Sequence, residues 1–228
     1  MINKVIDYEE LFDSIFTQFK EVLVKLNNYT LPSVSQIALK YEANPYLILL
    51  SALISLRTKD EVTLTASERL FSLATTPGQM LKLSQETIEQ AIYPSLYYKR
   101  KTQNIIKISQ ILITEYNSQV PNEAKALLTL PGVGIKTANL TLNLGFNIEA
   151  ICVDCHVHTI ANRMGLIKTT TPEDSVVALS AIMPKRFWIP LNELFVSYGM
   201  QVCTPQSPRC SLCPRTLVCP KTGVGKTR

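Results

Sequence analysis

The chain has 228 residues, of which 46% are hydrophobic, and this apolar content excludes a predominantly disordered protein. Its eight glycines are too few for a turn-rich β-sandwich, and its six cysteines are too few for a disulfide scaffold of this length. The formal net charge is +5, and the C-terminal segment 203–228 holds all of this excess, with five basic side chains and no acidic one. Such a segment fits a polyanionic partner, most often nucleic acid, as well as it fits a solvated tail.

The dominant hydrophobic period along the chain is helical. Apolar residues recur every three or four positions, and no segment alternates as a strand would. We expect an all-α protein of about ten helices. The expected helices lie over about 8–27, 45–56, 60–72 (capped by Asp60), 101–116, 121–130 (opened by Pro121), 135–144, from Asp154, after Pro172 and over 187–198, with a break at 75–78.

The sequence predicts no membrane segment. The longest apolar stretch, 46–56, has 11 residues. A helix that spans a bilayer needs roughly 20. The N-terminal residues lack the basic start and the small-residue cleavage site of a secretory signal. We expect a cytoplasmic, nucleoid-associated monomer whose cysteines are metal ligands or reactive thiols.

Four of the six cysteines follow one another closely near the C-terminus. Their pattern is Cys203-x6-Cys210-x2-Cys213-x5-Cys219. Four thiolates suit zinc or an iron–sulfur cluster. Structural zinc sites usually pair their ligands at two to four intervening residues, and one pair here has that spacing. The wider gaps favour a [4Fe–4S] cluster and leave zinc as the alternative.

The string LPGVGIKTA at 130–138 predicts two helices that meet across a glycine turn. The backbone of Gly132, Val133 and Gly134 can approach an anion such as a DNA phosphate at the start of the second helix. Lys136 falls in the first turn of that helix, where a positive charge is unfavourable. This placement favours a nucleophilic amine, and a phosphate-binding lysine is the alternative.

Asp154 precedes a helical pattern, and we expect it to be both the N-cap of that helix and a catalytic carboxylate. Both histidines of the chain, His156 and His158, follow it closely. Together with Cys152 and Cys155 they could form a compact zinc site. Adjacent residues at a helix start point in different directions, which argues against that site.

These motifs together resemble the endonuclease III family, the iron–sulfur members of the helix-hairpin-helix DNA glycosylases. The resemblance rests on LPGVGIKTAN at 130–139, VDCHVHTIANR at 153–163 and the four-cysteine segment 203–219, and it extends weakly from about Leu31 to the end of the chain. It implies that Lys136 is the catalytic lysine and Asp154 the catalytic aspartate. It also implies that Cys203, Cys210, Cys213 and Cys219 bind a [4Fe–4S] cluster.

The fold implied by this resemblance has two lobes. A six-helix barrel is expected over 38–148, with its helix-hairpin-helix at about 121–145. A discontinuous cluster lobe is expected over 1–37 and 149–228. The family binds double-stranded DNA between the two lobes, so the resemblance implies that Lys136 and Asp154 reach the same flipped nucleotide.

The implied function is a bifunctional DNA glycosylase and abasic-site lyase of base excision repair, which removes oxidised or ring-saturated pyrimidines through a lysine Schiff base. Besides the hairpin, Arg57, Arg209 and Arg215 are the expected DNA contacts. One alternative is a glycosylase of the same fold for another lesion, such as a mismatched thymine or uracil, or a pyrimidine dimer. Another is a non-catalytic iron–sulfur DNA-binding module.

The chain departs from the family pattern at four positions. Arg57 stands where the family often has glutamine, and this makes the preference for the opposite base uncertain from sequence. Cys155 stands where threonine is usual, Thr159 where a basic residue is common, and Leu96 where glycine is expected. None of these changes touches the lysine and the aspartate.

Overall fold

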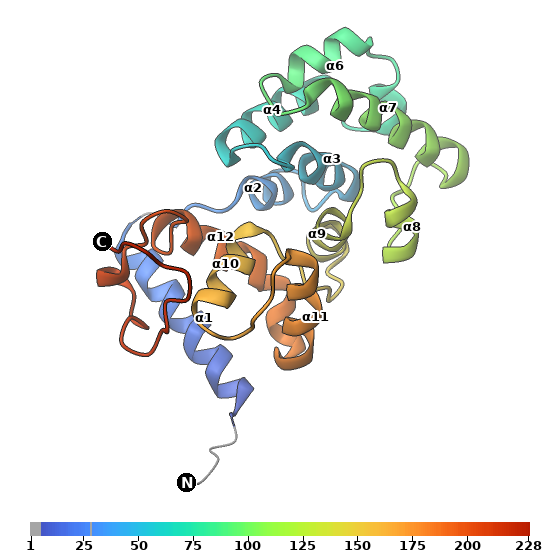
Figure 1. Ribbon diagram of the computed structural model, residues 1–228. Coiled ribbons are helices and arrows are strands. Elements are labelled where there is room, and N and C mark those ends of the chain that lie inside the picture. The colour runs from blue at the N-terminus through green and yellow to red at the C-terminus, as the bar shows by residue number, and fades with distance from the viewer. Residues whose placement is uncertain (1–5, 28) are drawn as a thin grey trace. The chain divides into compact units, whose positions relative to one another are not determined.

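The computed structural model describes residues 6–27 and 29–228, and every regular element within these ranges is a helix (Figure 1). The predicted all-α class is therefore confirmed. The chain forms two compact units, one made of the described residues up to Leu31 together with Ile151–Arg228, the other of Pro32–Ala150. Each unit has its own hydrophobic core. Within the described ranges, no helix has both the length and the apolar character that crossing a bilayer requires.

The unit Pro32–Ala150 is built around a buried central helix, α3 (Pro45–Ser55). Asn44 starts this helix, because its side chain accepts from the N–H of Tyr46 at 3.0 Å and from that of Leu47 at 3.3 Å. Nine of its eleven residues are buried, which fits a helix that other helices cover on all sides (Figure 1). The surrounding helices are α2 (Ser33–Lys40), α4 (Asp60–Leu73), α5 (Pro77–Met80), α6 (Gln85–Ile92), α7 (Tyr98–Glu115), α8 (Ala124–Thr129) and α9 (Ile135–Phe146).

Asp60 does not cap its own helix, contrary to the prediction. The N-cap of α4 is Lys59, and Asp60 is the first helical residue. The Asp60 carboxylate instead accepts from the backbone N–H of Ser33 at 2.9 Å and from its hydroxyl at 2.7 Å. It thereby satisfies a backbone N–H in the first turn of α2. The N-cap residue of α2 makes no side-chain hydrogen bond to this turn. Asp60 thus forms a tertiary hydrogen bond to α2 in place of the predicted local cap of α4.

Three other sequence predictions in this unit were wrong in detail. Pro77 begins the short helix α5, capped by Thr76, where a simple break was expected. Pro121 lies before α8, which starts at Ala124, and α7 begins at Tyr98 rather than at Lys101. The helices α2 and α6 were missed because eight residues make only about two turns, too few to establish a period.

The other unit packs α1 (Tyr8–Lys25) and α10 (Cys155–Arg163) against α12 (Trp188–Gln201). The Phe19 and Tyr198 rings stack at the centre of this packing, with their planes 2° apart. The helix α11 (Pro172–Ile182) and two short 3₁₀ turns, Lys185–Phe187 and Cys210–Leu212, complete the unit. The segment after α12 is mostly irregular and carries the four closely spaced cysteines.

Candidate functional site

The turn between α8 and α9 exposes backbone beside a helix N-terminus. Gly132 has a φ of +78°, and a Cβ there would collide with the side-chain amide of Asn104 on α7, so glycine is required. Gly134 is the exposed N-cap of α9, and a Cβ there would meet no atom within 4 Å. Since no side chain caps α9, the N–H groups of its first turn can bind an anion that approaches this open side.

Lys136 is the second residue of α9 and is half-buried. It therefore lies in the first helical turn directly after the glycine turn, as the sequence motif predicts. Val133, between the two glycines, is buried and anchors the turn in the core of its unit. The hairpin thus presents backbone donors and one amine from neighbouring positions.

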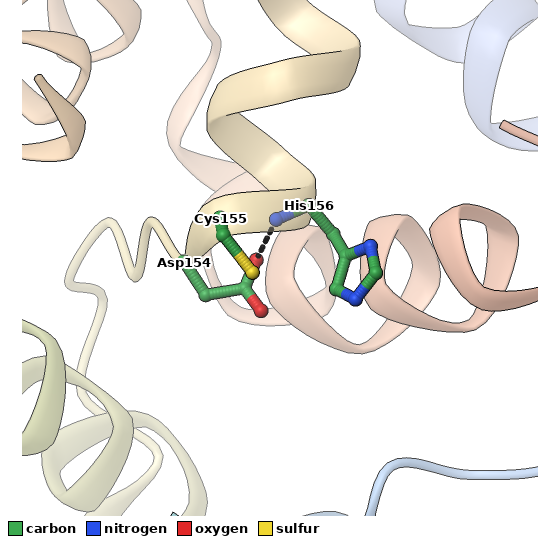
Figure 2. A group of neighbouring side chains, drawn as sticks. All are labelled: Asp154, Cys155 and His156. Carbon is green, nitrogen blue, oxygen red and sulfur yellow. Dashed lines mark hydrogen bonds between the residues drawn. The ribbon is translucent and has the colours of Figure 1, made fainter. Parts of the chain in front are cut away.

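Asp154 is the N-cap of α10, which confirms this part of the prediction. Its Oδ1 accepts from the backbone N–H of His156 at 2.9 Å (Figure 2) and from that of Val157 at 2.9 Å. The residue is only 8% exposed. Two helix N–H donors stabilise negative charge on this nearly buried carboxylate.

The four residues that the sequence suggested as alternative zinc ligands, Cys152, Cys155, His156 and His158, do not all come together. Cys152 is fully buried, and His158 Nδ1 lies 2.7 Å from the hydroxyl of Ser175 on α11. Cys155 and His156 do come together, and the third member of their group is Asp154. The three side chains project from the start of α10 (Figure 2).

The cysteines Cys203, Cys210, Cys213 and Cys219 line one cavity in their unit, together with Tyr198 and the end of α10. Among the residues that the structure describes, no three of these sulfurs all lie within 4.8 Å of one another. Four thiolates on one tetrahedral zinc would lie about 3.8 Å apart, given Zn–S bonds of about 2.3 Å. A cubane binds each thiolate through a different iron and needs the wider spacing.

Arg163, which sequence reasoning missed, binds the backbone at the start of this cysteine segment. It is 7% exposed, and its guanidinium donates to the backbone carbonyls of Cys203 at 3.2 Å and Thr204 at 2.9 Å, and to that of Pro205. It also lies 3.5 Å from Cys203 Sγ. Burial raises the pKa of the Cys203 thiol, and Arg163 acts in the opposite direction by stabilising the thiolate.

Arg57 lies in the turn between α3 and α4, exposed and with a left-handed backbone (φ 53°). The ammonium of Lys101, on α7, holds this turn by donating to the carbonyls of Ile54 at 2.6 Å and Leu56 at 2.9 Å and to the Thr58 hydroxyl at 2.8 Å. Burial lowers the pKa of Lys101 to about 8.

Lys101 is also a residue that sequence reasoning missed. It is 5% exposed. The one available signal was its position four residues before Ile105, on the stripe that α7 buries. The contacts of its ammonium fix the backbone from which Arg57 projects.

The two arginines of the cysteine segment differ in their surroundings. Arg209 is exposed and precedes the 3₁₀ turn Cys210–Leu212. Arg215 is half-buried, and its guanidinium donates to the Ser14 hydroxyl of α1 at 3.2 Å. Arg209 is therefore the more accessible of the two to a partner outside the unit.

Comparison with known proteins gives one consistent family. A model described as "HhH-GPD superfamily base excision DNA repair protein" matches residues 50–185. The endonuclease III of Thermotoga maritima is 42% identical over 172 residues, which cover 75% of this chain and 81% of that protein. The endonuclease III of Buchnera aphidicola is 32% identical over 210 residues, 92% of this chain and 90% of that one.

The chain belongs to the endonuclease III family. A solved structure of a trapped covalent intermediate between endonuclease III and DNA superposes with a TM-score of 0.78 at 26% identity, covering 95% of this chain and 97% of that one. The family resemblance and the helix-hairpin-helix glycosylase fold read from the sequence are thereby confirmed. As a member of this family, the protein is a DNA glycosylase of base excision repair.

Proposed function

We propose that this endonuclease III family member is a bifunctional glycosylase and abasic-site lyase that removes oxidised or ring-saturated pyrimidines from double-stranded DNA. The observation that carries the lyase activity is Lys136 in the first turn of α9. Family members that excise mismatched adenine or thymine are understood to lack this lysine. The similarity to a protein trapped covalently on DNA supports the same reading.

In the proposed reaction, the neutral Lys136 amine attacks C1′ of the deoxyribose as the bond to the damaged base breaks. The nitrogen then loses a proton and O4′ gains one, so the C1′–O4′ bond breaks and a protonated imine forms between Nζ and C1′. Removal of a C2′ proton breaks the bond between C3′ and its oxygen, and the 3′ strand leaves with a phosphate at its 5′ end. Water hydrolyses the imine and restores the amine.

Asp154 is the proposed partner of this amine. The carboxylate can accept the proton that the lysine must lose, and its negative charge can stabilise the cationic sugar transition state. The helix cap holds it in one orientation, because both of its backbone bonds end on the same oxygen. Little reorganisation is then needed during the reaction.

DNA binding is proposed to use the backbone of Gly132, Val133 and Gly134 on a phosphate, with Arg209 and Arg215 on neighbouring phosphates. Arg215 would have to exchange its bond to Ser14 for such a contact. Arg57 is proposed to enter the gap that the flipped base leaves. Each phosphate that the protein neutralises is expected to add about 0.9 to the salt slope of the logarithm of affinity.

A panel of duplexes, each with one defined lesion, tests the proposed activity. We expect excision of ring-saturated and oxidised pyrimidines, with the strand cut on the 3′ side of the lesion and an unsaturated aldehyde left at the new end. Duplexes with a mismatched thymine, a uracil or a pyrimidine dimer serve as the competing substrates. Base release that leaves the strand intact until alkali is added would contradict the lyase, and preference for a competing substrate would contradict the lesion class.

We also propose that Cys203, Cys210, Cys213 and Cys219 hold a [4Fe–4S] cluster. The donor set fits, because all four thiols line one cavity of the same unit. When bound, the cluster supplies a covalent link among four points of an irregular segment. It would thus fix the backbone that carries Arg209.

Replacing Cys203 with serine is expected to remove the cluster from the purified protein. The wild-type chain should contain about four irons and absorb at roughly 400 nm. The Cys203→Ser protein should lose both, whereas Cys155→Ser, which changes an exposed cysteine outside the four, should keep them. An unchanged spectrum in Cys203→Ser would remove this residue from the ligand set, and zinc in place of iron would refute the cluster.

A further inference from the structure

We infer that Asp154, Cys155 and His156 form a binding site for a soft divalent cation, and that Zn²⁺ is the ion their donors favour. A carboxylate oxygen, the thiol sulfur and an imidazole nitrogen all lie within 4.8 Å of one another (Figure 2). Across residues 6–27 and 29–228, no other three cysteine, histidine or acidic side chains bring their ligand atoms this close. The group therefore stands apart from the four cysteines of the proposed cluster.

The local fold explains why three consecutive side chains converge. Asp154 turns its carboxylate toward the helix start because Oδ1 caps α10, and the cap leaves the second oxygen, Oδ2, outside these two bonds. His156 packs against α12 at Gly199, where a Cβ would lie 2.8 Å from His156 Cγ. The absence of a side chain at Gly199 thus sets the imidazole in place beside the cap.

Cys155 supplies the sulfur donor of the group. Its side chain is exposed at the first position of α10. Three ligands on a tetrahedral zinc, at bond lengths of about 2.0–2.3 Å, lie roughly 3.3–3.8 Å apart. The three donor atoms lie within 4.8 Å of one another, so they must close by at most roughly 1.0–1.5 Å to bind one ion.

The chemistry of the donors selects the ion. Thiolate and imidazole favour zinc, whereas Mg²⁺ and Ca²⁺ require oxygen ligands. The positive end of α10 disfavours a cation, but the carboxylate and the thiolate bring two negative charges that balance Zn²⁺. Three protein ligands leave the fourth position for water, so this would be an open site rather than a closed structural one.

The proposed site depends on the thiolate of Cys155, because the hydroxyl of a threonine at this position would not supply one. A zinc ion here would occupy the carboxylate that we propose as the partner of Lys136, and would inhibit repair. This consequence rests on the proposed function, but the binding of the ion does not.

Calorimetric titration of the cluster-loaded protein with zinc chloride tests the binding. We expect one Zn²⁺ per chain, and affinity at least tenfold weaker in Cys155→Thr and in His156→Asn, since loss of a ligand should cost no less than the roughly 10–100-fold that supporting residues contribute. His158→Asn is the matched control and should bind as the wild type does, because His158 is bonded to Ser175 instead. Cobalt should give a thiolate-to-metal absorption in the difference spectrum that Cys155→Thr lacks.

Equal zinc affinity in the wild type and in Cys155→Thr, or no binding beyond the cluster metal, would overturn the inference. Strand cleavage is then measured with and without zinc, each variant against its own activity without zinc. Inhibition of the wild type but not of Cys155→Thr supports both the site and the role of Asp154. Zinc binding without inhibition keeps the site and contradicts the role of Asp154, so the two proposals fail separately.

Discussion

Replacing Lys136 with glutamine is expected to abolish covalent trapping on abasic-site DNA and to lower strand cleavage by at least about 10³-fold. Glutamine keeps a polar end on a side chain that is one bond shorter, but it has no nucleophilic amine. Because Lys136 is half-buried, the free energy of unfolding is measured for both proteins, and an unchanged value shows that the fold is intact. Loss of activity would then report the loss of the amine.

Borohydride gives the direct measurement. It reduces the imine between Nζ and C1′ to a stable amine, and the protein then migrates with the DNA on a denaturing gel. Lys125→Gln is the matched control, because Lys125 is an exposed lysine on α8, the first helix of the same hairpin. It should trap as the wild type does. A covalent complex that persists in Lys136→Gln would assign the nucleophile to another residue.

Asp154→Asn is expected to bind damaged duplex normally and to turn over about 10²–10⁴-fold more slowly. Asparagine caps a helix as well as aspartate, so α10 should keep its start and its stability. The neutral amide can neither accept the lysine proton nor balance positive charge on the sugar. Binding and chemistry should therefore separate in this variant.

Single-turnover cleavage, together with a binding isotherm, measures the two effects. The control is Asp7→Asn, which alters the aspartate that caps α1 in the same unit by accepting from Glu10 N–H at 3.1 Å. If both variants cleave at near wild-type rates, Asp154 is only a helix cap. If Asp154→Asn loses binding in proportion to its rate, the carboxylate acts in recognition rather than in chemistry.

Features that depend on neighbours along the chain were predictable. Pro45 marks the start of α3, the glycines at 132 and 134 mark the hairpin, and Asp154 marks the start of α10. In each case the partners lie within a few residues, so their spacing in the sequence is their spacing in the helix. The family resemblance rests on the same kind of local signal.

Features that depend on distant partners were decided by the tertiary structure. Asp60 accepts a hydrogen bond from the first turn of α2, and Lys101 donates to the turn that contains Arg57. Arg163 donates to the backbone of the cysteine segment. The partners of these three side chains lie 27, 45 and 40 residues away. A buried or half-buried charge takes the hydrogen-bond partners that the packing brings to it, and the one-dimensional pattern does not record which those are.

The chain's helical period, its hairpin and its motif residues thus determined the class of fold and the family from sequence alone. The convergence of Asp154, Cys155 and His156 could not be read in that way. Their order along the chain suggested divergent directions at a helix start, and only the cap on Oδ1 and the space beside Gly199 turn them together. Side-chain direction is set by packing and by hydrogen bonds across the unit, and these exist only once the helices have assembled.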